Sequence, residues 1–168
     1  PDPGLPGKCH GGWLLCQSRA MHSIVLVDDH AIVREGFKRL IELEPDLEVV
    51  AECRSADDAV EAVGHWRPDL VALDLSLPDG SGLPLIEHLL SVHASTRVVV
   101  LSMHDGDPYV SEALRRGASG FVTKGVAPDE LVAGLRSVMQ GECFLSSDLR
   151  QRRTDRPSEA LDPVNRLT

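Results

Sequence analysis

Five short apolar runs alternate with stretches of helical periodicity, and this alternation constrains the fold of the chain more than any other feature. The runs cover residues 24–27, 47–53, 70–73, 98–101 and 120–123. The runs at 24–27, 70–73 and 98–101 are continuously apolar, which is typical of strands that are buried on both faces of a parallel sheet. The run 47–53 carries Glu48 and Glu52, a pattern that suits an edge strand.

Between these runs, apolar residues recur three and four positions apart, as they do along one face of a helix. The members of the five stripes are Val33, Phe37, Leu40 and Ile41; Ala59, Ala62, Val63 and Trp66; Ile86, Leu89 and Leu90; Val110, Ala113 and Leu114; and Leu131, Leu135, Val138 and Met139. Right-handed crossovers place such helices on both faces of a parallel sheet. The sequence therefore predicts an α/β fold, a doubly wound sheet of five parallel strands.

Residues at the expected helix ends agree with this interpretation. Ser55 stands where it can cap the second helix, and Gly141 directly follows the last one. His30 is expected to start the first helix. Ala127 precedes the last helix at a position where Ser or Asp would cap it, a difference of about 1 kcal/mol.

Polar side chains follow the strands at their carboxyl ends. Asp28 and Asp29 follow the first run, Asp74 the third, Ser102 the fourth and Lys124 the fifth. Because open α/β sheets bind ligands at the carboxyl ends of their strands, we expect these side chains to converge on one pocket. Any one of them alone is explained at least as well as a helix cap or a solvated side chain.

The chemistry of the whole set is more informative than that of its members. Three carboxylates held together repel one another and need a cation or protons between them. Oxygen ligands at a small site favour Mg²⁺, which prefers a phosphate as a further ligand. A nearby ammonium group and hydroxyl add the contacts that a phosphoryl group needs. The set therefore predicts a Mg²⁺-dependent phosphoryl-binding pocket.

Other phosphate-binding and hydrolytic sites lack their motifs in this chain. No G-x-x-x-x-G-K-[ST] loop, no G-x-G-x-x-G after the first strand and no G-x-S-x-G elbow is present. An aspartyl phosphatase needs a second Asp two positions after its nucleophile, and Ser76 stands there. A Mg²⁺-dependent phosphohydrolase is therefore the least favoured of the hypotheses.

Four motifs carry a resemblance to a known family. They are VDDH at 27–30, LDLSLPDGSG at 73–82, LSMHD at 101–105 and GASGFVTKG at 117–125. Over residues 23–141 the chain resembles the receiver domain of response regulators in bacterial two-component signalling, and within them the NarL/FixJ branch. The resemblance implies a flavodoxin-like receiver fold with strand order 2-1-3-4-5. In that branch a linker and a LuxR-type helix-turn-helix domain follow the receiver.

The resemblance also implies roles for the acidic residues. Asp74 would accept a phosphoryl group from the phosphohistidine of a sensor kinase. Asp29 and Asp74 would bind Mg²⁺ directly, Asp28 would act mainly through water, and Ser76 would contribute its backbone carbonyl. Such a domain is no enzyme in the usual sense, because it catalyses at most its own phosphorylation and dephosphorylation.

The remaining motif residues would bind the phosphoryl group and respond to it. Lys124 and Ser102 would contact the phosphoryl oxygens. Ser102 and Phe121 would then move together as a switch that alters the surface of the fourth and fifth helices. Met103 and His104 border the expected pocket and would tune access to it.

The ends of the chain differ in composition from its middle. Residues 1–20 are rich in Pro and Gly and lack periodicity, so we expect a leader segment without stable structure. Residues 21–144 are expected to form the receiver domain. Residues 145–168 are predicted to be a polar linker toward a DNA-binding domain that the chain does not contain.

Charge and hydropathy restrict the partners of the chain. The net charge of -9 argues against non-specific binding of nucleic acid. No apolar run approaches the ~20 residues of a membrane span, and the four cysteines form no C-x-x-C pair, as expected for free thiols in the cytoplasm.

We therefore expect a cytoplasmic protein that meets a sensor histidine kinase and forms a homodimer when phosphorylated. It would contact DNA only through the missing domain. The alternative is a pseudo-receiver, which would share the fold and act by protein contact without phosphorylation.

Overall fold

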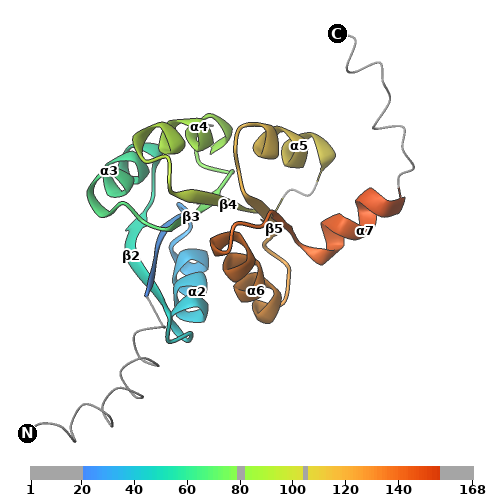
Figure 1. Cartoon of the computed structure of the whole chain (residues 1–168), viewed down its shortest axis with the longest axis horizontal. Helices are drawn as coiled ribbons and strands as arrows, with labels where there is room; N and C mark the ends of the chain where they lie inside the picture. The colour runs from blue at the N-terminus through green and yellow to red at the C-terminus, as the bar shows by residue number, and fades with distance from the viewer. Residues whose placement is uncertain (1–20, 79–81, 104–105, 156–168) are drawn as a thin grey trace, which may run out of the picture.

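The computed structural model describes residues 21–78, 82–103 and 106–155, and these form a three-layer α/β sandwich (Figure 1). Six parallel strands make one sheet in the order β2-β1-β3-β4-β5-β6. The strands are β1 (His22–Val27), β2 (Leu47–Cys53), β3 (Leu70–Asp74), β4 (Arg97–Ser102), β5 (Gly120–Thr123) and β6 (Phe144–Leu145). The predicted order of the first five strands is confirmed, and β6 is an addition beside β5.

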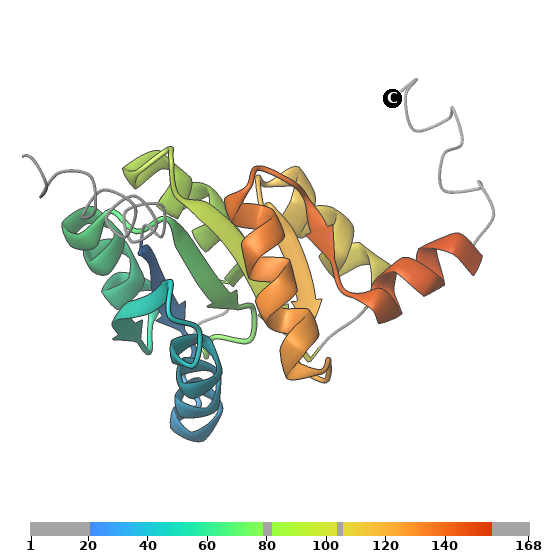
Figure 2. The same cartoon turned by 60° about the horizontal axis from the view of Figure 1, so that its bottom comes forward.

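Helices cover both faces of the sheet, as right-handed crossovers require. They are α2 (Ala31–Glu42), α3 (Ala56–Trp66), α4 (Gly82–Val92), α5 (Asp107–Arg115), α6 (Pro128–Met139) and α7 (Ser147–Asp155). Figure 1 shows α3, α4 and α5 on one side of the sheet and α2 and α6 on the other. Figure 2 shows the strands between these layers, with α7 extending away from the body of the domain.

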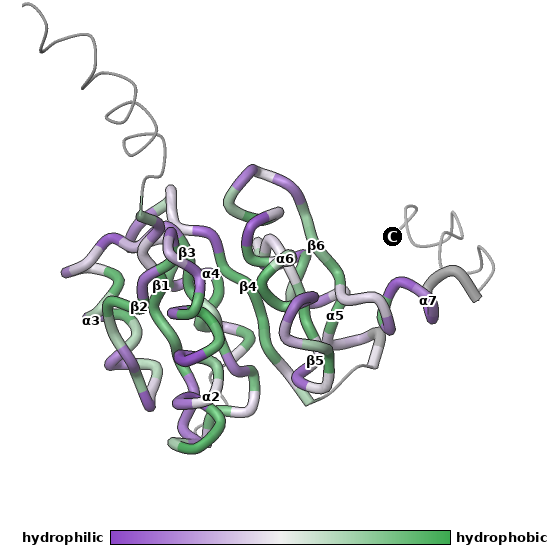
Figure 3. The backbone as a smooth tube through the Cα atoms, turned by 90° about the horizontal axis from the view of Figure 1, so that it is seen from below, coloured by the Kyte–Doolittle hydropathy of each residue, from purple (hydrophilic) through white to green (hydrophobic). Residues whose placement is uncertain are grey.

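The core is divided into two parts by the sheet, because successive side chains of a strand point to opposite faces. On β1, Val25 and Val27 pack in the cluster under α3, α4 and α5, whereas Ile24 and Leu26 pack in the cluster under α2 and α6. All four are at most 2% exposed. Figure 3 shows the resulting hydrophobic colouring along the central strands. The uninterrupted apolar runs therefore reflect burial on both faces, as predicted.

The helix ends follow the local chemistry expected from the sequence. Ser55 caps α3 and its hydroxyl accepts a hydrogen bond from the Asp58 N–H at 3.2 Å. His30 and Ala127 stand at the starts of α2 and α6 without a capping hydrogen bond from their side chains. Gly141 follows α6 with a φ of 96°, a conformation that glycine adopts without strain.

The segment after residue 143 is more ordered than a linker would be. β6 pairs with β5, and the Ser146 N–H donates to the carbonyl of Phe121 at 3.1 Å. Leu149, in α7, is 2% exposed and packs in the cluster under α3, α4 and α5. A strand of two residues and a helix with a single buried leucine give no readable periodicity, so the sequence did not predict them.

The predicted leader at 1–20 lies outside the described residues, as do residues 156–168 of the predicted linker. Within the part of the chain that the structure describes, no helix combines the length and the apolar character needed to cross a membrane.

Candidate functional site

The carboxyl ends of four adjacent strands meet at one edge of the sheet. The pairing aligns Val27 of β1 with Leu73 of β3, and Asp74 with Leu101 of β4. Ser102 pairs in turn with Thr123 of β5. This register brings the residues that follow each strand to the same level, so the predicted site residues lie together.

Lys124 lies between two buried carboxylates. Its Nζ is 2.9 Å from Asp28 Oδ2 and 3.2 Å from Asp74 Oδ2. The side chains of Lys124, Asp28 and Asp74 are only 7%, 6% and 1% exposed. Buried charges are tolerated only when they are paired. One ammonium group therefore faces two carboxylates, and these three groups together carry a net negative charge.

The two carboxylates do not share the ammonium group equally. Burial acts to raise the pKa of Asp28, but hydrogen bonds from Lys124 and from the backbone N–H of His30 outweigh it, so the pKa is lowered. Burial raises the pKa of Asp74, and the negative charge of Asp28 acts in the same direction, against the backbone N–H of Ser76 and Lys124. Asp74 is therefore the carboxylate that is poorly compensated.

Asp74 also has an oxygen atom that lacks a hydrogen bond. Its Oδ1 accepts a hydrogen bond from the Ser76 N–H at 2.9 Å. Its Oδ2 is buried and accepts none, although Lys124 Nζ is 3.2 Å away. Asp29 Oδ1 is likewise buried without a hydrogen bond. Buried oxygen atoms of this kind fit a hard divalent cation such as Mg²⁺, which takes oxygen ligands.

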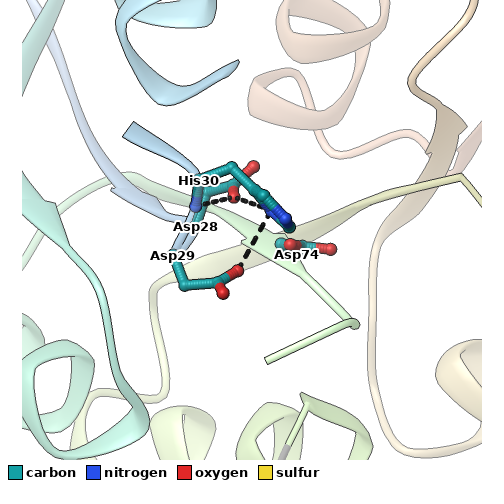
Figure 4. A group of neighbouring side chains, drawn as sticks. All are labelled: Asp28, Asp29, His30 and Asp74. Atoms are coloured by element: carbon teal, nitrogen blue, oxygen red, sulfur yellow. Dashed lines mark hydrogen bonds and ion pairs between the residues drawn. The ribbon is translucent and has the colours of Figure 1, made fainter. Parts of the chain in front are cut away.

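His30 completes the cluster, and the sequence had placed it only as the start of a helix. Its Nδ1 is 3.3 Å from Asp28 Oδ1 and 3.2 Å from Asp29 Oδ1 (Figure 4). One donor atom each from Asp28, Asp29, His30 and Asp74 lie within 4.8 Å of one another. The motif VDDH puts a histidine beside the acidic pair, but the direction of its ring depends on the turn that follows β1.

A cavity of about 430 Å³ opens beside Lys124, between β4, β5 and the starts of α6 and α7. Ser102 and Lys124 line it, and the Lys124 N–H donates to the Ser102 carbonyl at 2.9 Å. Met103 lies at its rim with 73% of its surface exposed. Phe121 is fully buried in the hydrophobic core. His104, the other predicted pocket residue, lies outside the described part of the chain.

Residues 24–136 match the family model of the response regulator receiver domain. The chain belongs to this family. The match covers all five predicted strands and most of α6.

Curated relatives of this receiver domain are regulatory proteins, several of them named as transcriptional. It is 42% identical over 129 residues to the transcriptional regulatory protein UhpA of Escherichia coli, covering 77% of this chain and 64% of UhpA. It is 34% identical over 155 residues to the oxygen regulatory protein NreC of Staphylococcus epidermidis, covering 86% of this chain and 71% of NreC. The chain thus spans about two thirds of the length of these relatives.

Solved structures of LuxR-family regulators have the same fold. A two-component response regulator of the LuxR family from Aurantimonas sp. is 39% identical, with a TM-score of 0.76, covering 79% of this chain and 94% of that one. The signal receiver domain of a response regulator designated NarL from Mycobacterium tuberculosis is 31% identical, with a TM-score of 0.70 and coverages of 73% and 99%. The receiver therefore belongs to the NarL/LuxR group of two-component response regulators.

Proposed function

We propose that the receiver domain accepts a phosphoryl group on Asp74 from the phosphohistidine of a sensor kinase, in a reaction that depends on Mg²⁺. The observation that carries this proposal is the buried Asp74 carboxylate, 3.2 Å from the ammonium group of Lys124 and within an acidic cluster. Phosphoryl transfer depends mainly on positioning and on charge neutralisation. The described side chains can supply both.

In the proposed step, a carboxylate oxygen of Asp74 attacks the phosphorus atom and forms an O–P bond. The P–N bond to the kinase histidine breaks, and its electron pair stays on the imidazole nitrogen. Lys124 balances negative charge on the phosphoryl oxygens. Asp28, Asp29, Asp74 and the Ser76 carbonyl would hold Mg²⁺, which supplies further positive charge when it is bound.

The Ser102 hydroxyl then donates to a phosphoryl oxygen of the modified Asp74. This contact favours a second arrangement of the loop after β4 and of Phe121, because the acceptor oxygens exist only after phosphorylation. Met103, at the rim of the cavity, limits the approach of the phosphodonor and of water. The output is a changed surface at α5 and α6.

For the whole protein, we propose that residues 21–144 act as the receiver and that the segment from residue 145 onward leads to a DNA-binding domain. The relatives that support this division are the transcriptional regulatory protein UhpA and the oxygen regulatory protein NreC, both longer than the chain. A solved structure of RcsB, which is 25% identical, has two dimers bound to DNA. A homodimer that forms on phosphorylation would present two such domains.

The proposal is tested by intact-protein mass spectrometry after treatment with acetyl phosphate. We expect the wild type to gain one phosphoryl group with Mg²⁺ and none with a chelator. Asp74→Asn should gain none, and Asp57→Asn, an exposed position on α3, should behave as the wild type. Equal labelling of the wild type and Asp74→Asn would refute the assignment.

Labelling, together with measurements of Mg²⁺ binding and of phosphate release, separates the two alternatives. A pseudo-receiver would show no labelling and no affinity for Mg²⁺. A phosphohydrolase would release phosphate from small phosphoesters over many turnovers, whereas a receiver discharges only its own acyl phosphate.

A further inference from the structure

The His30 side chain lies against the acidic cluster in a way that the proposed function does not use. Its Nδ1 is 3.3 Å from Asp28 Oδ1 and 3.2 Å from Asp29 Oδ1. Figure 4 shows its ring reaching from the end of β1 across the carboxylates toward Asp74. The cluster therefore contains one nitrogen donor in addition to its oxygen donors.

The backbone of the turn fixes the position of this ring. The His30 N–H donates to Asp28 Oδ1 at 2.8 Å, and His30 is the residue from which α2 starts. On the other side of the turn, the Arg34 guanidinium donates to the Asp28 carbonyl at 2.6 Å. The ring is 61% exposed, but it is attached to a backbone that is held at both ends.

The distances between the donor atoms suit a common metal ion. Neighbouring ligands at about 2.1 Å from an ion are about 3.0 Å apart in an octahedral site and about 3.4 Å apart in a tetrahedral one. The two distances from His30 Nδ1 fall between these values. A second observation is Asp74 Oδ2, which is buried, accepts no hydrogen bond and has only the ion pair with Lys124 Nζ at 3.2 Å among the described contacts of that atom.

We propose that His30 is a metal ligand through Nδ1 and that it shifts the preference of the pocket from Mg²⁺ toward transition-metal dications. Mg²⁺ prefers oxygen ligands, whereas Co²⁺, Ni²⁺ and Zn²⁺ bind imidazole well. When Nδ1 binds an ion, the ring carries its proton on Nε2. The inference rests on the proposed function only in that the acidic pocket holds a divalent cation.

The test compares the binding of Co²⁺ and Mg²⁺ by calorimetry, at one fixed pH near neutrality. The proteins are the wild type, His30→Gln, and His88→Gln as a control at an exposed histidine of α4. We expect His30→Gln to weaken Co²⁺ binding about tenfold, as loss of a ligand does, and to change Mg²⁺ binding by less than about threefold. His88→Gln should change neither.

A spectroscopic measurement identifies the ligand directly. The ¹H NMR spectrum of the Co²⁺-bound wild type should contain a strongly shifted imidazole N–H signal that disappears in D₂O. This signal should persist in His88→Gln and be absent from His30→Gln. An unchanged ratio of Co²⁺ to Mg²⁺ affinity in His30→Gln, or persistence of the signal there, would overturn the inference.

Labelling of Asp74 keeps this inference distinct from the proposed function. Acetyl phosphate and Mg²⁺ could label the wild type and His30→Gln equally, while the Co²⁺ affinity and the shifted imidazole signal are the same in both proteins. In that case only the inference about His30 fails. If the wild type is not labelled at all, the proposed function fails, and the Co²⁺ measurements still decide whether His30 is a ligand.

Discussion

Asp74 occupies an electrostatically unfavourable position in this domain. Lys124 is shared with Asp28, and the pKa of Asp74 is raised by burial and by the charge of Asp28. A carboxylate that must ionise in such a place lowers the stability of the fold in exchange for reactivity. The site can therefore accept a cation or a phosphoryl group, but without one its buried negative charge lowers the free energy of unfolding.

This position gives a prediction about stability. In the absence of divalent ions, Asp74→Asn should increase the free energy of unfolding at neutral pH by on the order of 1 kcal/mol. The substitution removes a buried charge and leaves Lys124 paired with Asp28. Urea denaturation of both proteins measures the difference, with Asp57→Asn as a control.

The stability gained by Asp74→Asn should be larger at neutral pH than at acidic pH. Because the folded-state pKa of Asp74 is raised, its contribution to stability is most favourable below the ordinary carboxyl pKa of about 3.9 and is lost as pH rises through the folded value. The advantage of Asp74→Asn should therefore shrink as the pH falls. An advantage that is constant across pH would contradict this explanation.

Some side-chain positions at the site could be predicted from the sequence and others could not. That Asp28, Asp29, Asp74 and Lys124 would converge followed from their positions after the strands, since parallel strands end at one edge. That the His30 ring would lie on the carboxylates did not follow, because it depends on the hydrogen bond between the His30 N–H and Asp28 Oδ1. The side-chain directions in a short polar turn depend on local hydrogen bonds, which the hydrophobic periodicity of a sequence does not reveal.

At the scale of elements, the two helix starts that differ in capping give a matched pair of predictions. Ser55→Ala should lower the free energy of unfolding by about 1 kcal/mol, because it removes the hydrogen bond to the Asp58 N–H. Ala127→Ser should raise it by about 1 kcal/mol, because α6 starts without a capping side chain. Urea denaturation of both variants measures these changes, and equal effects of the same sign would contradict them.

The contact between β5 and α7 gives a second prediction at this scale. Asp148 accepts hydrogen bonds from Thr123 Oγ1 at 2.8 Å and from Ser146 Oγ at 2.7 Å. Asp148→Ala should speed amide hydrogen exchange in residues 147–155, because each lost hydrogen bond is worth about 1 kcal/mol. Asp148→Asn, which keeps an acceptor oxygen, should be less affected. Unchanged exchange in Asp148→Ala would show that other contacts hold α7.

The stabilisation that these hydrogen bonds to Asp148 provide should depend on pH. Burial acts to raise the pKa of Asp148, but the hydrogen bonds from Ser146 and Thr123 outweigh it, and the pKa is lowered. Their stabilisation is therefore present above the ordinary carboxyl pKa and lost as pH falls through the lowered value. The protection of the α7 amides in the wild type, measured against the intrinsic exchange rate at each pH, should therefore decrease over that acidic range.

The elements that could be predicted are those with a clear period. The central strands read as uninterrupted apolar runs and the five helices between them as regular stripes. β6 and α7 could not be predicted, because Phe144 and Leu145 form too short a strand and Leu149 is the buried apolar anchor of an otherwise polar helix. Their positions depend on pairing with β5, which is a tertiary contact.

At the scale of the whole molecule, the proposed switch predicts a change of assembly. Beryllofluoride, which was used as a phosphomimetic with the receiver domain of RcsB, should with Mg²⁺ increase the dimer fraction of the wild type. New acceptor oxygens at Asp74 would favour the arrangement of Ser102 and Phe121 that presents the dimer surface. Sedimentation velocity measures this fraction. Asp74→Asn should stay unchanged, and an equal increase in that variant would contradict the switch.

The central claim is that Asp74 is the phosphoryl acceptor of this domain, and chemical mapping of the modified residue tests it most directly. The protein is treated with acetyl phosphate and Mg²⁺, reduced with borohydride, which converts an aspartyl phosphate to homoserine, and digested for peptide sequencing by mass spectrometry. We predict homoserine at position 74 alone, and only when Mg²⁺ is present. Homoserine at another aspartate, or none at position 74 in a protein that has gained a phosphoryl group, would contradict the account.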